Sequence, residues 1–231
     1  MKKVMKAVAA LMLMIVVVFA LGCTKEEASS NSYNGHEYVD LGLPSGTLWA
    51  TCNVGATTSE GYGDCLAWGE TKTKIDYDWN TYKYCNGGFD NLIKYCTDAN
   101  CGYNGFTDNL TILQPEDDAA TANWGKGWRM PTYDDWDELF QNTTNAWITQ
   151  NGVNGRRFTG SNGNSLFLPA AGLKEGDKYY YVGKSGYYWL SSSYAAGSYS
   201  AWIINFSSHP CGKNWYPRFY GLSIRPVRSA E

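Results

Sequence analysis

The sequence has few histidines and few basic residues, and these shortages exclude several classes of protein. Two histidines occur in 231 residues, and 19 lysines and arginines are set against 22 acidic residues, for a formal net charge of −3. Nucleic-acid binding requires a basic face, which this balance does not supply. The sequence also lacks any Cys-x-x-Cys pair, a common spacing of zinc ligands. We therefore expect no nucleic-acid partner and no bound metal or other cofactor.

Long uncharged apolar runs are also scarce, and the one that stands out lies at the N-terminus. It covers residues 7–21 and follows Lys2, Lys3 and Lys6. A membrane-spanning helix needs roughly 20 apolar residues, so this run is too short to cross a bilayer. Positive charge followed by a short apolar run is typical of a secretory signal peptide, which we predict over residues 1–22.

The junction after this run resembles a bacterial lipoprotein signal. Cys23 follows Gly22 directly and precedes a polar stretch, so the resemblance implies that Cys23 is lipid-modified and becomes the first mature residue. Residues 23–34 then form a lipidated tether. Residues 25–27 resemble an export tag that sends lipoproteins to the outer face. We expect attachment to the outer membrane or cell surface through the lipid anchor only.

The remaining chain, residues 35–231, is long enough for one hydrophobic core, and we expect a single domain. It holds six cysteines, namely Cys52, Cys65, Cys85, Cys96, Cys101 and Cys211. An even number suits an oxidising compartment, and a bridge among Cys85, Cys96 and Cys101 is one option, although sequence cannot fix the pairing. Cys52 lies in an apolar segment and is expected to be a buried free thiol.

Short apolar stretches alternate with Gly- and Asn-rich breaks, which predicts short strands and long loops. The expected strands are 37–43, 47–53, 165–170, 178–182, 187–191, 201–206 and 222–227, with turns at 175–177 and 183–186. Two helices are also expected. This mixture indicates an α+β fold with small antiparallel sheets, two helices and long irregular loops.

The two predicted helices lie in the middle third of the chain. Thr132 stands three residues before Asp135 in an approximate capping box, and Trp136, Leu139 and Phe140 form an apolar stripe, which predicts a helix of about ten residues. A second helix is expected from Pro115 to Gly125. Its start would place the carboxylates of residues 116–118 near the positive end of the helix dipole.

Several long blocks resemble the fibrobacter-type major paralogous domain. They are YVDLGLPSGTLWA at residues 38–50, AWGET at 67–71, and DDAA through WRMPT at 117–132. The C-terminal end agrees through YWLSSS at 188–193, AW at 201–202 and GLSIRPV at 221–227. The resemblance therefore covers nearly the whole mature chain.

That family is similar to formylglycine-generating and C-type-lectin-like folds. The resemblance implies a C-type-lectin-like fold, in which a small twisted sheet and two helices support a variable surface made by the C-terminal strands and loops. The tryptophans of these blocks are then scaffold residues. They are Trp49, Trp68, Trp124, Trp128 and Trp189.

We expect no catalytic residue, although an enzyme related to formylglycine-generating enzymes remains an alternative. That activity would imply two reactive cysteines late in the chain, and only Cys211 lies there. A lone Cys211 nucleophile would need His209 as its base. Calcium-dependent sugar binding would imply Glu-Pro-Asn and Trp-Asn-Asp motifs, and neither occurs.

Residues 194–220 are the predicted ligand-binding segment. Tyrosine and tryptophan are interleaved there with Ser, Gly and Asn, a composition typical of antibody-like binding loops. The candidate ligand-binding residues are Tyr194, Tyr199, His209, Asn214, Trp215, Tyr216, Arg218 and Tyr220. Residues 201–206 are expected to be a core strand, and the aperiodic, proline-containing stretch 207–217 a loop.

Residues 191–226 also resemble the variable segments of lectin-like proteins that retroelements diversify at adenines. The stretch contains no Glu, Gln or Met, while Lys213, Trp202 and Trp215 would be unmutated positions. We predict a surface-anchored binding module, such as an adhesin or receptor, with a protein or glycan ligand. A purely structural envelope lipoprotein remains a further alternative.

Overall fold

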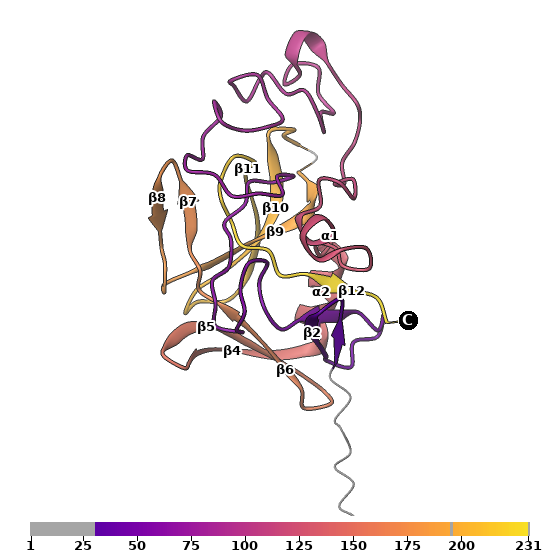
Figure 1. Cartoon of the computed structure of the whole chain (residues 1–231), viewed down its shortest axis with the longest axis vertical. Helices are drawn as coiled ribbons and strands as arrows, with labels where there is room; N and C mark the ends of the chain where they lie inside the picture. Colours follow the sequence, from indigo (N-terminus) through magenta and orange to yellow (C-terminus); the bar gives the residue numbers. More distant parts are fainter. Residues whose placement is uncertain (1–30, 195, 231) are drawn as a thin grey trace, which may run out of the picture. The chain divides into compact units, whose positions relative to one another are not determined.

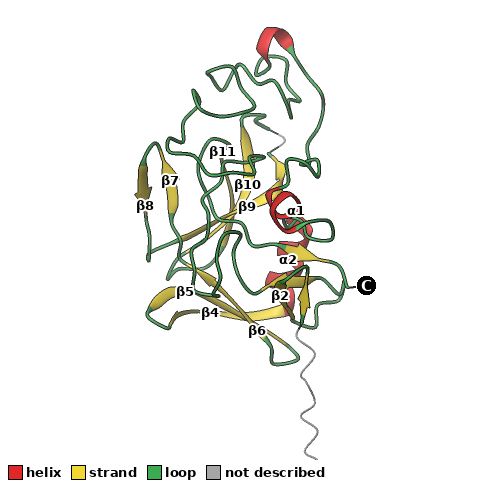
Figure 2. Ribbon diagram, viewed as in Figure 1, coloured by secondary structure: helices red, strands yellow, loops and turns green. Residues whose placement is uncertain are grey.

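The computed structural model describes residues 31–194 and 196–230. These residues belong to one compact unit that begins at Asn31, while the predicted signal peptide, Cys23 and most of the predicted tether lie outside the described residues. The described chain forms four small antiparallel sheets, two α-helices and long loops (Figures 1 and 2). The expected α+β class is therefore confirmed.

The first sheet joins the two ends of the described chain. Its order is β1-β2-β3-β12, with β1 (Ser32–Tyr33), β2 (His36–Asp40), β3 (Leu48–Ala50) and β12 (Val227–Arg228). Strand β1 lies within the predicted tether, so the compact unit begins a few residues earlier than residue 35.

The central sheet has the order β11-β10-β9, with β9 (Gly186–Ser193), β10 (Ser200–Phe206) and β11 (Gly212–Pro217). Trp189 and Ile203 belong to one hydrophobic cluster, while Tyr188 and Ile204 belong to another. Because alternate residues of a strand point to opposite faces, the sheet is covered on both sides. This is why β9 is buried at nearly every position.

Two further sheets are hairpin-based. One has the order β4-β5-β6, with β4 (Thr143–Gln150), β5 (Val153–Gly160) and β6 (Ser165–Pro169), and the other pairs β7 (Leu173–Glu175) with β8 (Lys178–Tyr180). The predicted turn at 175–177 is confirmed. Strands β4 and β5 were not predicted, although Asn151 and Gly152 have the positive φ angles of a two-residue hairpin turn.

Helix α2 (Tyr133–Asn142) confirms the predicted helix and its capping box. The Thr132 hydroxyl accepts from Asp135 N, and the Asp135 carboxylate accepts from Thr132 N. Arg129 then binds Asp135 through two hydrogen bonds of 2.5 and 2.8 Å. Trp136 and Leu139 are buried against the core, whereas Phe140 is exposed.

Helix α1 (Ala119–Trp124) is shorter than predicted. Asp118 is its N-cap and accepts from Thr121 N, so the chain from Pro115 to Asp118 precedes the helix. The Asp118 carboxylate also accepts from Met130 N at 2.8 Å. The start at Pro115 was therefore wrong, because Asp118, three residues later, supplies the capping oxygen.

The five tryptophans predicted as scaffold are all buried. Two of them bind across the core, since Trp68 Nε1 donates to Leu190 O and Trp189 Nε1 donates to Leu66 O. The predicted strand 222–227 was wrong in extent. Residues 221–223 make isolated bridges to other segments, and only Val227 continues into β12.

Candidate binding surface

The segment predicted as a loop over residues 207–217 is half strand. Strand β11 pairs with β10 in antiparallel register, with Trp215 opposite Trp202 and Pro217 opposite Ser200. The prediction was wrong because β11 is an edge strand with both faces partly covered, so its exposure does not alternate. Proline is tolerated on such edges.

A buried arginine fixes the turn between β10 and β11. Arg156 of β5 donates through Nη2 to Ser207 O at 3.0 Å and to His209 O at 2.6 Å, and its Nη1 donates to Asn145 Oδ1. Only 6% of Arg156 is exposed. Charged hydrogen bonds in a buried setting are strong, so the turn is held rigidly while the side chain of His209 faces solvent.

Four rings gather on one face of the hairpin, and we call Tyr133, Tyr194, Trp202 and Trp215 the aromatic surface. Tyr194 stacks on Trp215 with ring centroids 5.2 Å apart and meets Trp202 edge-on at 5.0 Å. Tyr133 of α2 meets Trp202 at 5.3 Å. Trp215 is 42% exposed. The surface thus presents to solvent a tryptophan ring that is supported by stacking on Tyr194.

An ion pair borders the aromatic surface. Lys213 of β11 forms a salt bridge with Asp137 of α2, and its ammonium lies 3.6 Å from the Tyr133 ring centroid. Burial lowers the pKa of Lys213, but the hydrogen bonds to Asp137 and Tyr133 outweigh it and leave the pKa raised. Lys213 is therefore charged at neutral pH and ties β11 to α2.

The other candidate tyrosines pack toward the core. Tyr199, Tyr216 and Tyr220 are half-buried against the first hydrophobic cluster. Tyr216 contacts Tyr187 at 5.6 Å and Tyr220 at 5.4 Å between ring centroids. Because they are half-buried against the core, they support the surface more than they form it.

Arg218 is not a ligand-binding residue, because it is fully buried. Its Nη2 donates to Tyr95 O at 2.9 Å, and its guanidinium lies 4.6 Å from the Trp68 ring centroid. Burial lowers its pKa. The prediction was wrong since the chain turns inward after Pro217, and Arg218 ties the end of the hairpin to the long loop that contains Tyr95.

The eight predicted residues therefore separate by environment. His209, Asn214 and Trp215 are exposed, Tyr194, Tyr199, Tyr216 and Tyr220 are half-buried, and Arg218 is buried. Tyr133 and Trp202 complete the surface, yet neither was a candidate. Trp202 was predicted to be core, and nothing in the local sequence indicates that Tyr133 meets it from a separate helix.

The cysteines of the described chain are free thiols. Cys52 and Cys211 are half-buried, so the prediction of a buried Cys52 was wrong, and none of Cys85, Cys96 and Cys101 is bridged in the structure. Burial raises the pKa of Cys211 to about 11. A thiol nucleophile acts as the thiolate, so Cys211 is protonated at neutral pH.

Asp117 is not placed at a helix terminus. It is buried and accepts from Tyr95 Oη at 2.7 Å, from Lys94 Nζ at 2.5 Å and from the Tyr84 hydroxyl. Burial would raise its pKa, but these hydrogen bonds outweigh it and hold the pKa below its ordinary value. The carboxylate anchors the irregular segment between β3 and α1.

The described residues contain no group of three or more His, Cys, Asp or Glu side chains able to hold a metal ion. Over residues 31–194 and 196–230, none of the helices has both the length and the apolar character needed to cross a bilayer.

The chain matches no family model, no curated protein and no solved structure.

Proposed function

We propose that this protein is a lipid-anchored, surface-displayed binding module whose aromatic surface contacts a protein partner. The observation that carries the proposal is the exposed Trp215, stacked on Tyr194 on an edge strand whose turn is held by buried Arg156. Rigid, exposed aromatic side chains lose little rotamer entropy on binding and dominate interface energetics.

The domain is proposed to be C-type-lectin-like. The small antiparallel sheets, the two helices and the position of the candidate surface on strands β10 and β11 support this assignment. So does the burial of the five tryptophans in the blocks that resemble the major paralogous domain. Attachment through a lipidated Cys23 and display on the cell surface complete the proposal.

A glycan is the second candidate partner. The pyranose faces of sugars stack on tryptophan and tyrosine rings, and the hydrogen-bonding groups of exposed His209 and Asn214 lie on the same hairpin. A protein is favoured because the aromatic surface borders the Lys213–Asp137 ion pair and helix α2. Aromatic residues are enriched at the centres of protein interfaces.

The test is binding of the labelled full chain, in a non-glycosidic detergent, to extracellular-protein and glycan arrays. Loss of a hot-spot side chain costs 2 kcal/mol or more, so Trp215→Ala should weaken protein binding by about 30-fold or more. Tyr179→Ala, an exposed tyrosine on β8, is the matched control. Binding unaffected by Trp215→Ala would reject the aromatic surface as the site, and binding to glycans alone would favour the second candidate.

An enzyme related to formylglycine-generating enzymes and a purely structural envelope protein are the alternatives. The protonated Cys211 argues against the first. The second predicts no saturable ligand on either array. Diversification of residues 191–226 stays a proposal as well, and it suits the exposed positions His209 and Asn214 better than buried Arg218. A genome lacking both a nearby reverse transcriptase and a near-copy of the segment would remove it.

A further inference from the structure

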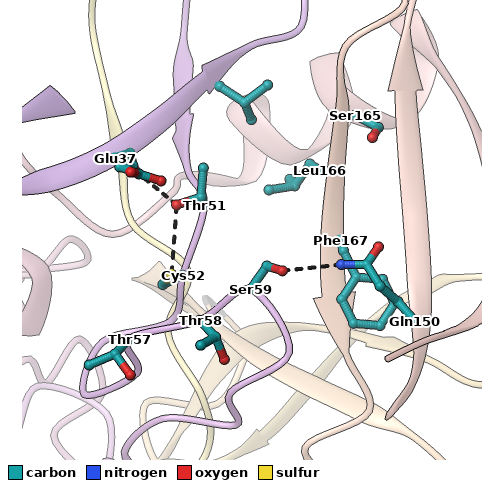
Figure 3. Close-up of a pocket in the computed structure, with 11 residues that line it drawn as sticks. Glu37, Thr51, Cys52, Thr57, Thr58, Ser59, Gln150, Ser165, Leu166 and Phe167 are labelled. Carbon is teal, nitrogen blue, oxygen red and sulfur yellow. Dashed lines mark hydrogen bonds between the residues drawn. The ribbon is translucent and has the colours of Figure 1, made fainter. Parts of the chain in front are cut away.

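A groove separate from the aromatic surface lies between the first sheet and the β4-β5-β6 sheet (Figure 3). It has a volume of about 340 Å³ and is bordered by β2, the chain after β3, the loop at 57–59, the end of β4 and the start of β6. A second hollow continues from it and shares Glu37, Thr51, Cys52 and Thr57. Sites for small ligands typically occupy about 300–1,000 Å³.

The groove is lined with solvent-exposed polar groups that have no hydrogen-bond partner among residues 31–194 and 196–230. The Glu37 carboxylate and the hydroxyls of Thr57, Thr58 and Ser165 line it, and none of the hydrogen bonds among the described residues uses these atoms. They are therefore available to a ligand that offers both donors and acceptors.

The walls of the groove are fixed. Gln150 Nε2 donates to Ser59 Oγ at 3.1 Å, the contact drawn in Figure 3, and to Glu60 Oε1 at 2.7 Å. Asn151 Nδ2 also donates to Glu60 Oε1. These contacts bind the loop at 57–59 to the end of the β4–β5 hairpin, so the spacing of the two sides is set before any ligand arrives.

Aromatic rings complete both parts of the groove. Phe167 lines the first part but is only 4% exposed. In the second part half-buried His36 stacks on buried Trp124, with centroids 3.8 Å apart and an interplanar angle of 6°. Burial lowers the pKa of His36, so the imidazole is neutral at pH 7 and extends the ring wall without adding charge.

The lining selects among ligand classes. No lysine or arginine lines either part, so nothing compensates the charge of a phosphate or sulfate. One carboxylate alone does not form the oxygen cage that a divalent cation requires. An apolar ligand would leave the hydroxyls and the carboxylate unpaired, at a cost in free energy. A neutral molecule rich in hydroxyl groups satisfies all of these conditions.

We propose that this groove binds a neutral oligosaccharide. Glu37 accepts hydrogen bonds from sugar hydroxyls, and the threonine and serine hydroxyls donate and accept. The half-buried His36 ring, supported from behind by Trp124, contacts an apolar sugar face. The site is independent of the proposed protein-binding role, because no residue of the aromatic surface lines it.

Cys52 makes this proposal testable without a functional assay, since its half-buried thiol lines both parts of the groove. The full chain is alkylated with N-ethylmaleimide in a non-glycosidic detergent, with and without maltohexaose, cellohexaose, xylohexaose or chitohexaose, and each thiol is followed by peptide mass spectrometry. At least one hexasaccharide should slow alkylation of Cys52 in a saturable manner. Cys101, also half-buried, should react at its usual rate.

Variants identify the contact. Glu37→Gln removes a charged acceptor and should raise the half-protecting concentration by about tenfold, and Thr57→Trp should abolish protection by filling the groove. Asp177→Asn, an exposed carboxylate elsewhere, and Trp215→Ala should leave protection intact, which separates this site from the aromatic surface. Circular dichroism checks that each variant is folded.

Three results would overturn the proposal. They are no protection of Cys52 by any of the four hexasaccharides, equal protection of Cys101, or protection that persists unchanged in both Glu37→Gln and Thr57→Trp.

Discussion

At the scale of single residues, environment separates side chains that composition treats alike. Trp215 and Arg218 are three positions apart in a segment of binding-loop composition, yet one is exposed on an edge strand and the other is buried beneath Trp68. Composition favours a binding role for both. Only the inward turn of the chain after Pro217 distinguishes them.

The buried Asp117 predicts a dependence of stability on pH. Its pKa in the folded state is lowered, so its contribution to stability is present above its ordinary pKa of about 4 and is lost as pH falls through the lower folded value. Asp117→Asn should flatten this acid limb and cost about 3 kcal/mol at neutral pH. Urea unfolding measured across pH tests this, with Asp177→Asn as control. An unchanged acid limb would contradict it.

Tyr84 and Tyr95 predict that stability also falls at alkaline pH. Burial raises the pKa of both, and their hydrogen bonds to Asp117 raise it further. Their contribution is present below the ordinary tyrosine pKa of about 10 and is lost as pH rises toward the higher folded values. Replacing both by phenylalanine should lower stability at pH 7 and weaken its alkaline dependence in the same urea series. An alkaline dependence identical to that of the wild type would argue that these hydroxyls do not govern it.

At the scale of elements, the β10–β11 turn depends on Arg156 from another sheet. Arg156→Met removes the donors to Ser207 O and His209 O, and charged hydrogen bonds contribute about 1.5–3 kcal/mol, so amide exchange over residues 207–211 should rise by about tenfold or more. Arg157→Met, its exposed neighbour, is the control in hydrogen–deuterium exchange. Equal exchange in the two variants would mean that the turn holds itself.

Helix α2 offers a local test of the capping box. Thr132→Ala removes the hydroxyl that accepts from Asp135 N and should lower the free energy of unfolding by about 1 kcal/mol. Thr144→Ala, an exposed position on β4, should change it by less than about 0.5 kcal/mol. Chemical denaturation measures both free energies of unfolding. If Thr132→Ala lowers this free energy no more than Thr144→Ala does, the cap does not stabilise α2.

Helix α2 and the β7–β8 turn were predicted because the sequence signals that specify them are local. The capping box and apolar stripe of α2 lie within ten residues, and the β7–β8 turn has its glycine at the bend. Strand β11 could not be predicted because rings from elsewhere in the chain lie against it. Tyr194 stacks on Trp215, and the Tyr133 ring lies against Lys213. The β4–β5 hairpin was missed although its Asn151-Gly152 turn is a strong hairpin signal.

At the scale of the whole molecule, anchoring and display are testable together. The full chain expressed with an alkynyl fatty acid should be labelled, and Cys23→Ser should abolish the label while releasing the protein from the membrane fraction. Protease added to intact cells should cleave the labelled protein, because it is displayed on the surface. An unlabelled wild type would remove the anchor from the proposed function.

The sequence could not predict which distant residues come together to form the two candidate sites. The aromatic surface draws on α2, β10, β11 and the residue that follows β9, and the groove draws on segments more than 100 residues apart. Such proximity comes from tertiary packing, which periodicity and capping do not encode. The buried tryptophan scaffold was predictable, since its residues lie in the blocks that resemble the major paralogous domain.

The pairing of β12 with β3 in the sheet that also contains β1 has a practical consequence for display (Figure 1). A peptide fused beyond Arg228 would leave the compact unit near its first strand, because the Arg228 guanidinium lies 3.9 Å from the Tyr33 ring centroid. Cargo intended to project outward belongs instead in the solvent-facing bend at residues 208–210, where Arg156 steadies the backbone on which it would be grafted.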